Sequence, residues 1–320
     1  MRKLAIHPLR HPPQSQQGIA LITALIIVSI VVTVAAWLVE RQQIDIRQTA
    51  NVLHLEQAYQ YADAIEAWAS AILVRDFQKN KKVDSLDEDW ATILPQIPIK
   101  GGSIKAKLSD LQGRFNINNI IDNGDKVIPR QLAILQGLLR RLNMDAKLAA
   151  VITDWLDKNP VITGSDGAEM DYYLGLESAY LSADTAMVSN SELRLLKGLD
   201  EKNTALLSKH IATLKTQGNP IGINVNTASS EVLVALGLND SLATDLIEQR
   251  EDQAFQTVDE FFTQPEVDKL IKDRSGISVN SQWFLLHADI QIDRSRVRLN
   301  SILFRDQNGV TRVVQRNYGL

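Results

Sequence analysis

Acidic side chains gather in one short segment of the sequence, where their spacing could serve a cation site. The segment also contains Pro160, Gly164 and Gly167, which favour a loop that can fold around a ligand. Carboxylate and amide oxygens in such a loop suit Ca²⁺, which takes roughly six to eight oxygen ligands in a flexible geometry. We therefore predict a structural Ca²⁺ site, whose candidate ligands are Asp154, Asp157, Asn159, Asp166, Glu169 and Asp171. The spacing of these residues differs from that of an EF-hand. The alternative to a Ca²⁺ site is a solvated acidic loop that follows the end of a helix.

Residue types that carry catalysis are otherwise scarce. The chain has no Cys, which excludes disulfides, thiol catalysis and iron-sulfur clusters. Beyond residue 18 only His54, His210 and His287 remain, and no two of them stand at the spacing of a metal-binding pair. The sequence contains neither a G-x-S-x-G motif nor a phosphate-binding P-loop motif. We therefore expect a protein that is not an enzyme, in preference to a membrane-anchored hydrolase.

The amino-terminal end has the pattern of a membrane anchor. Residues 1–18 hold Arg2, Lys3 and Arg10 but no acid, and residues 19–39 hold no charged side chain. At about 1.5 Å per residue, a helix over this run is roughly 30 Å long, which is enough to cross a bilayer. The basic residues before the run predict a cytoplasmic leader and a body on the far side of the membrane. A secretory signal peptide fits less well, because the apolar run is too long.

The pattern after the membrane segment predicts a long helix and then strands. Apolar residues at helical spacing continue from Arg41 to Phe77 with no Pro or Gly, so one helix of about 55 to 60 residues is expected. A membrane-proximal coiled coil is the alternative. Alternation over 103–108, a turn over 110–113 and a second apolar alternation over 114–118 predict a β-hairpin.

Strand patterns return only at the end of the chain, and the residues between are helical. Alternating residues predict three more antiparallel strands, over 284–292, 297–303 and 310–314. Residues 122–280 carry helical patterns and almost no strand pattern. This order predicts an α+β fold in which a head made of residues 40–121 and 281–320 is interrupted by a helical insertion domain.

The helical insertion contains recognisable start signals. Ser189 and Glu192 form a capping box, and Asn143 and Thr227 are candidate N-caps. The clearest helical patterns cover Arg130–Arg141, Met144–Leu156, Ser191–Lys197 and Ser230–Ala235.

One part of the insertion resembles the helix-hairpin-helix modules of DNA-uptake receptors. Such modules hold phosphate with a glycine-rich hairpin and nearby basic residues. Here the hairpin over 236–240 contains one glycine and ends in Asp240, and Arg250 is the only basic residue between 216 and 268. The net charge of −4 also argues against bulk attraction to nucleic acid. We expect no nucleic-acid partner, and a membrane-anchored DNA-uptake receptor remains the alternative function.

The residues at the start of the apolar run resemble those of the type IV pilin and pseudopilin family. In that family a prepilin peptidase cuts the leader after a glycine that directly precedes the run, and then methylates the new amine. The matching residues here are Gly18 and Ile19, which we expect to flank the cleavage site. Most members carry Glu at the fifth mature position, where this chain has Thr23. That difference suits a subunit with no other subunit ahead of it in a fibre.

Motifs along the whole chain narrow the resemblance to the minor pseudopilin K family of type II secretion systems. The motifs are Gly113-Arg-Phe-Asn-Ile-Asn-Asn119, Asp154-Trp-Leu-Asp157, Gly167-Ala-Glu-Met-Asp-Tyr-Tyr173 and Asn224-Val-Asn-Thr-Ala-Ser229. The resemblance implies a long transmembrane helix on an antiparallel pilin-type sheet with a large all-α insertion. It also implies a place at the tip of a periplasmic pseudopilus, anchored in the inner membrane, that supports export of folded periplasmic proteins. Minor pseudopilins I, J and H and the prepilin peptidase are the implied partners.

The same resemblance bears on the acidic segment. Family members bind Ca²⁺ in this insertion through a D-W-x-D-x-D pattern and a G-A-E-D pattern. This chain carries Asn159 in place of the third Asp of the first pattern, and Met170 follows Glu169 in the second. An Asn oxygen can still coordinate Ca²⁺, although it contributes less charge.

Overall fold

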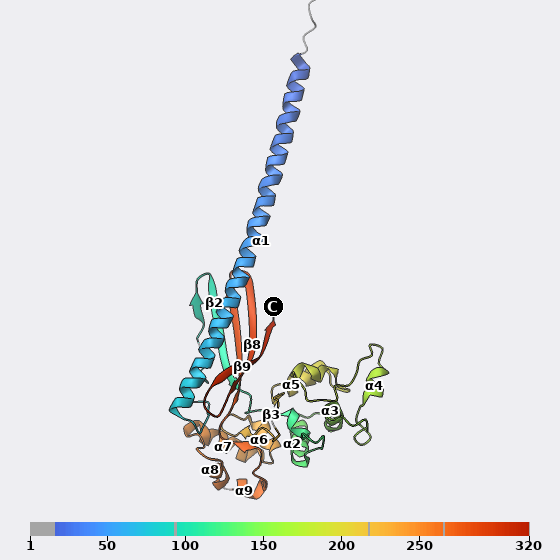
Figure 1. Ribbon diagram of the computed structural model, residues 1–320, viewed down its shortest axis with the longest axis vertical. Coiled ribbons are helices and arrows are strands. Elements are labelled where there is room, and N and C mark those ends of the chain that lie inside the picture. The colour runs from blue at the N-terminus through green and yellow to red at the C-terminus, as the bar shows by residue number, and fades with distance from the viewer. Residues whose placement is uncertain (1–16, 93–94, 217, 265, 320) are drawn as a thin grey trace, which may run out of the picture. The chain divides into compact units, whose positions relative to one another are not determined.

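The computed structural model describes residues 17–92, 95–216, 218–264 and 266–319 (Figure 1). The chain divides into two compact units, one ending at Gln57 and the other running from Ala58 to the end.

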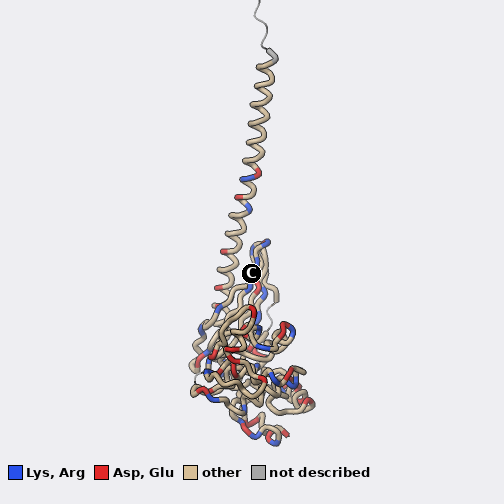
Figure 2. The backbone as a smooth tube through the Cα atoms, turned by 90° about the vertical axis from the view of Figure 1, so that its right-hand side faces the viewer, with Lys and Arg blue, Asp and Glu red and all other residues tan. Residues whose placement is uncertain are grey.

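The first helix, α1, runs without a break from Gln17 to Lys79 and confirms the single long helix expected from the sequence. Its amino-terminal part contains an 18-residue stretch of mean hydropathy 2.9, which is long and apolar enough to cross a membrane. Figure 2 shows that no charged residue interrupts this part of the helix. The hydroxyls of Thr23 and Thr33 donate to carbonyls one turn earlier, so they are satisfied within the helix.

A five-stranded antiparallel sheet in the order β1-β2-β7-β8-β9 forms the centre of the second unit. Buried and exposed side chains alternate along β2 and β7, because successive residues of a strand point to opposite faces. Its strands are β1 Ile97–Ile99, β2 Gly102–Asp110, β7 Trp283–Ile292, β8 Ser295–Arg305 and β9 Thr311–Gly319. The three carboxy-terminal strands confirm the sequence-based prediction.

The hairpin predicted between residues 103–108 and 114–118 is wrong. Strand β2 pairs with β1 on one side and with β7 on the other, whereas β3, Phe115–Asn116, forms a parallel pair with β4, Ile211–Ala212. The turn redirects the chain because it must pass close to the insertion. A Cβ atom on Gly113 would lie 2.6 Å from Thr227 Oγ1, so only glycine fits at this point.

Residues 58–79 of α1 lie along one face of the sheet (Figure 1). Ala58, Ala62 and Ala69 are fully buried there, and their small side chains let the helix approach the strands closely. Polar contacts join the same surfaces. Glu66 accepts hydrogen bonds from Ser301 and from both Nε and Nη2 of Arg316.

The insertion is mainly helical and gathers at one end of the sheet (Figure 1). Its α-helices are α2 Pro129–Arg141, α3 Leu148–Leu156, α4 Met170–Leu174, α5 Glu201–Leu207, α6 Ser230–Ala235, α7 Asp240–Asp252, α8 Val258–Thr263 and α9 Val267–Leu270. Two 3₁₀ turns, η1 Ile117–Ile120 and η2 Asn190–Leu195, and a short parallel pair of β5, Ile223–Asn224, with β6, Ile277–Ser278, complete it. One apolar cluster includes residues of α2, α3, α6 and α7, and Leu111, Ala212 and Leu214 form another.

The predicted helix start signals have mixed outcomes. The capping box of Ser189 and Glu192 is present, although it starts the 3₁₀ turn η2 rather than an α-helix. Asn143 is not an N-cap, because it follows α2 with a positive φ of 54° and α3 begins only at Leu148. Thr227 is not one either, since its hydroxyl donates to the Asp110 carboxylate.

Candidate metal centre and the contacts around the insertion

Three of the predicted metal ligands are buried together between α3 and α4. Asp154 lies in the last turn of α3, Asp157 is the residue that ends this helix, and Glu169 is the residue before α4. Their exposed fractions are 0%, 2% and 7%. The loop between the two helices therefore folds back so that its ends meet.

Each of the three carboxylates has a buried oxygen without a hydrogen-bond partner. These atoms are Asp154 Oδ2, Asp157 Oδ1 and Glu169 Oε1. The other oxygen of Asp154 accepts a hydrogen bond of 3.0 Å from the Thr163 backbone. A buried, unpaired carboxylate oxygen costs free energy, and a bound cation would supply the missing partner.

The charges of the group act on one another. Burial raises the pKa of Asp157 to about 6, with Asp154 and Asp125 adding to the effect. Burial likewise raises the pKa of Glu169 to about 7, with contributions from Asp154, Asp157 and Asp184. Burial and neighbouring negative charges both disfavour ionisation of a carboxyl group. A bound cation would reverse both effects, because positive charge favours the ionised carboxylates. Among the described residues, the three acids whose oxygens all lie within 4.8 Å of one another belong to a different group, described below, so a shared ion would need Asp154, Asp157 and Glu169 to move closer together.

Gly167 makes room for this arrangement. A Cβ atom at this position would lie 2.0 Å from Asp154 Oδ2, so a larger residue would displace that carboxylate. The sequence showed the glycine but gave no indication of what it contacts. Asp184 is a further acid of the group that the sequence analysis missed, with an unpaired buried Oδ1. No spacing rule could have found it, because it lies within the irregular segment between α4 and η2.

The remaining predicted ligands face solvent. Asn159 is exposed, and its side-chain oxygen accepts a hydrogen bond from the Val161 backbone. Asp166 lies 3.5 Å from Lys147 Nζ. Asp171 is exposed on α4. The structure therefore brings Asp154, Asp157 and Glu169 together and leaves these three at the surface.

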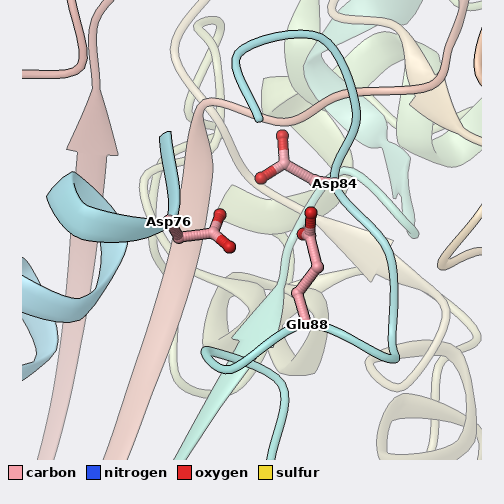
Figure 3. Close-up of side chains that lie close together, drawn as sticks. All are labelled: Asp76, Asp84 and Glu88. Atoms are coloured by element: carbon pink, nitrogen blue, oxygen red, sulfur yellow. The ribbon is translucent and has the colours of Figure 1, made fainter. Parts of the chain in front are cut away.

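A second acidic group, which the sequence analysis missed, lies where α1 ends. Asp76, Asp84 and Glu88 place carboxylate oxygens within 4.8 Å of one another (Figure 3). The guanidinium of Arg305 forms ion pairs with Asp76 and Asp84. Glu88 accepts a hydrogen bond of 2.7 Å from Trp90 Nε1. Because these carboxylates already have partners and a cation among them, the group is a structural joint and a poor metal site.

Asparagine side chains connect the insertion to the turn after β2. Asn116, Asn118 and Asn119 each donate to the carbonyl and accept from the N–H of a single distant residue. Those residues are Leu214, Met187 and Ile221, respectively, at distances of 2.8 to 3.1 Å. Each asparagine amide thereby provides the hydrogen-bond donor and acceptor that a neighbouring strand would otherwise provide to these buried backbone groups.

Two further asparagines near α6 also connect distant segments, and one of them pairs with a single backbone residue as the first three do. Asn226 pairs with both backbone groups of Phe255. Asn224 Nδ2 donates to the Asp84 carbonyl, to Asp110 Oδ2 and to Ser281 Oγ. Two of the sequence motifs therefore consist of residues that hold distant segments together.

The hairpin between α6 and α7 offers little to a phosphate. Asp240 forms an ion pair of 2.7 Å with Arg141. Arg250 Nη1 donates to the Val225 carbonyl at 2.6 Å, and burial lowers the pKa of this guanidinium to about 10. Both arginines near the hairpin are therefore engaged within the protein.

Known proteins with the same sequence features identify the family. Two family models described as "Type II secretion system (T2SS), protein K" match residues 113–216 and 223–280. A relative from Pseudomonas aeruginosa named "Type II secretion system protein K" is 34% identical over 321 residues, which cover 96% of this chain and 94% of the relative. The chain belongs to the type II secretion system protein K family. A second relative of that name, from Aeromonas hydrophila, is 29% identical and covers 95% of this chain and 97% of its own length.

A solved structure of the protein K family shares the fold. It comes from a complex titled as GspK-GspI-GspJ of enterotoxigenic Escherichia coli and superposes with a TM-score of 0.76, covering 85% of this chain and 99% of that chain at 24% identity. The α+β fold class expected from the sequence is confirmed. The protein K family models begin at Gly113 and Ile223, so both take in the asparagine segments described above. Together with the long apolar helix, this makes the chain a single-pass membrane-anchored member of the family with a soluble body.

Proposed function

We propose that the chain is a minor pseudopilin at the tip of the type II secretion pseudopilus, where it supports the export of folded periplasmic proteins. The observation that carries the proposal is the continuity of α1, whose apolar part is long enough to cross a membrane and whose residues 58–79 lie on an antiparallel sheet. Membership of the protein K family indicates that the secretion system is of type II.

Two features support a position at the end of the fibre. Thr23 stands at the fifth mature position, and its hydroxyl donates to the carbonyls of Ile19 and Ala20 at 3.0 Å. It brings no carboxylate to the amine of a subunit ahead, whereas a buried amine in lipid needs such a partner. The insertion of residues 122–280 also adds a large body to the head. Electron microscopy of pseudopili with a labelled insertion tests this proposal: label at one end supports it, and label repeated along the shaft contradicts it.

Processing would follow the prepilin pathway. We propose that a prepilin peptidase in the inner membrane cuts between Gly18 and Ile19 and methylates Ile19, with the leader cytoplasmic and the body periplasmic. Residues 1–16 lie outside the described part of the chain. Mass spectrometry of the membrane-extracted protein should give a methylated chain beginning at Ile19, and Gly18→Leu should retain the leader. A mature chain that starts at Met1 or near Ala36 would contradict the proposal.

The partners would be other minor pseudopilins. The solved relative is in a complex with proteins I and J, and we extend this pair, together with protein H, to the present chain. Co-expression followed by size-exclusion chromatography should give one complex of finite size. A head that polymerises alone would argue against the end position.

The acidic group between α3 and α4 would hold a structural Ca²⁺ ion. We propose Asp154, Asp157 and Glu169 as its ligands, because each has an unpaired buried oxygen. Ca²⁺ should raise the melting temperature of the protein over that in chelator, since a ligand of the folded state stabilises it. Asp157→Asn and Glu169→Gln should abolish the rise, and Asp171→Asn on the exposed face should keep it. Equal melting curves in calcium and chelator would reject the site.

No catalytic role is part of this proposal. The nearest approach to a hydrolase site is His210, whose Nδ1 lies 3.1 Å from Ser229 Oγ and 3.8 Å from Glu231 Oε2. A catalytic triad needs the serine and the acid on opposite ring nitrogens, whereas here both face the same nitrogen. The engaged arginines around the α6–α7 hairpin likewise give no support to the DNA-uptake alternative.

A further inference from the structure

A cavity of about 360 Å³ lies where the end of β2, the loop before β1 and the start of α6 meet. Three of its lining residues are basic: Lys107, Arg114 and Lys209. Arg114 and Lys209 both lower the pKa of the neighbouring His210, where burial is the larger cause, so their positive charges act on the same place. The cavity therefore has a positive wall in a chain of net negative charge.

Among the basic residues of this wall, Arg114 is the one best suited to bind an anionic group. It is half-buried, and burial lowers the pKa of its guanidinium, which the negative charge of Asp110 partly offsets. Within the described residues its side chain has no hydrogen bond or ion pair, although a guanidinium carries five N–H donors. The Arg114 nitrogens are not among the buried unpaired atoms of the described residues, so they are accessible to a ligand, and a bidentate carboxylate is the partner that a guanidinium fits.

The one carboxylate that lines the cavity is already occupied. Asp110 is buried and accepts hydrogen bonds from the Gln112 backbone, Thr227 Oγ1 and Ser281 Oγ, at 2.7, 2.5 and 2.6 Å, and from the Asn224 amide at 3.1 Å. None of these donors is Arg114. Burial is the larger effect on the pKa of Asp110 and raises it to about 6, although the hydrogen bonds from Ser281, Thr227 and Gln112 lower it. The acid facing His210 is Glu231, which lies next to the ring and is not among the lining residues.

The remainder of the wall combines small polar side chains with an apolar group. Leu86, Trp90 and Leu108 line it, and Leu86 is largely exposed. A free inorganic anion would leave these side chains uncovered, whereas a peptide could place a carboxylate against the basic wall and an apolar neighbour against Leu86. We propose that this cavity is a binding site for an acidic peptide of a partner protein, in which a carboxylate forms a bidentate pair with Arg114 and a second contact with Lys209.

The test uses the full chain in a neutral detergent and two matched peptides, acetyl-Leu-Glu-Leu-amide and acetyl-Leu-Gln-Leu-amide. Calorimetry measures affinity, and mass spectrometry after arginine and lysine labelling measures protection of Arg114 and Lys209. We expect the Glu peptide to bind and to protect both residues, and the Gln peptide to do neither. Arg114→Gln should weaken binding of the Glu peptide by about tenfold or more, because it removes the charge-assisted pair.

A control variant at an exposed arginine and a test with inorganic phosphate complete the experiment. Arg140→Gln removes an exposed arginine on α2 and should leave the affinity unchanged. Arg114→Lys keeps the charge but loses the fork, and should bind the Glu peptide with intermediate affinity. Equal binding of the two peptides, or an equal loss in the Arg140 and Arg114 variants, overturns the proposal. It is also overturned if inorganic phosphate alone protects Arg114 as fully as the Glu peptide does. If Arg114→Gln does not fold, the protection pattern of the parent protein decides.

Discussion

The buried carboxylates of the insertion make its stability depend on pH. The pKa values of Asp157, about 6, and Glu169, about 7, lie above the ordinary 3.8 and 4.5. Between the ordinary and the raised pKa values the folded protein binds more protons than the unfolded chain. The free energy of unfolding that these two groups contribute below about pH 4 is therefore lost as the pH rises to about 7. In chelator, a double variant of Asp157→Asn and Glu169→Gln should therefore gain stability relative to the parent from pH 5 to 8.

Urea unfolding of both proteins at several pH values measures this difference. A difference that stays constant with pH would show that the two carboxylates titrate normally. With calcium present the sign should reverse, because the ion binds the ionised carboxylates that only the parent retains.

Asn116, Asn118 and Asn119 each satisfy both backbone groups of a distant residue, so their amides are hard to replace. Asn118 donates to the Met187 carbonyl and accepts from the Met187 N–H, both at 2.9 Å. Asn118→Asp keeps the size but removes the donor, and Asn118→Leu removes both partners. We expect a loss of about 2 to 4 kcal/mol for each, because buried polar groups are left unpaired. Denaturant unfolding should show no such loss for the exposed Asn123→Asp, and an equal effect of the two sites would refute this role.

At the scale of elements, small residues set the distance between α1 and the sheet. Ala62 is fully buried, whereas Ala67 on the same helix is exposed. Ala62→Leu should destabilise the protein by about 1 to 3 kcal/mol, since the added side chain has no space. Ala67→Leu adds the same atoms to the solvent side and should change the unfolding free energy by less than about 0.5 kcal/mol. Similar effects of the two substitutions would mean that the helix and the sheet are not closely packed at this point.

Across the whole second unit, Arg305 at the end of β8 connects segments that are distant in the sequence. Its guanidinium donates to the Leu73 carbonyl at 3.3 Å, to Asp76 at 3.2 Å and to the Ser281 carbonyl at 2.9 Å, and it also bonds to Asp84. Arg305→Met would remove the counter-charge of two buried carboxylates, although Asp84 would still accept a hydrogen bond from the Ser281 backbone, and should cost about 3 to 5 kcal/mol.

The exposed Arg298→Met on the same strand is the control for this prediction. Urea unfolding should show a large loss for the first variant and almost none for the second. The loss should be smaller at pH 5 than at pH 8, because the pKa of Asp76 is raised to about 6 and protonation removes its unpaired charge. Identical unfolding midpoints at pH 8 would contradict the structural role of Arg305.

The sequence by itself determined those features that depend on local periodicity. The uncharged run of residues 19–39, the unbroken helix through residue 77, the alternation of the last strands and the capping box at Ser189 all agree with the structure. Each depends on residues within a few positions of one another, where side-chain spacing and backbone geometry are directly linked. The three buried carboxylates of Asp154, Asp157 and Glu169 were among the six acidic-segment residues, because α3 ends and α4 begins within that segment.

Only the tertiary structure decided which of these residues meet. It paired β2 with β1 and β7 instead of with residues 114–118, placed the half-buried Asp184 near the buried acids, and left Asp171 in solvent. It also gave Arg305 and the asparagines their partners. These contacts join residues from 24 to 232 positions apart. Sequence spacing carries no information on such pairs, because they are fixed by the packing of the insertion against the sheet and by the need to satisfy every buried polar group.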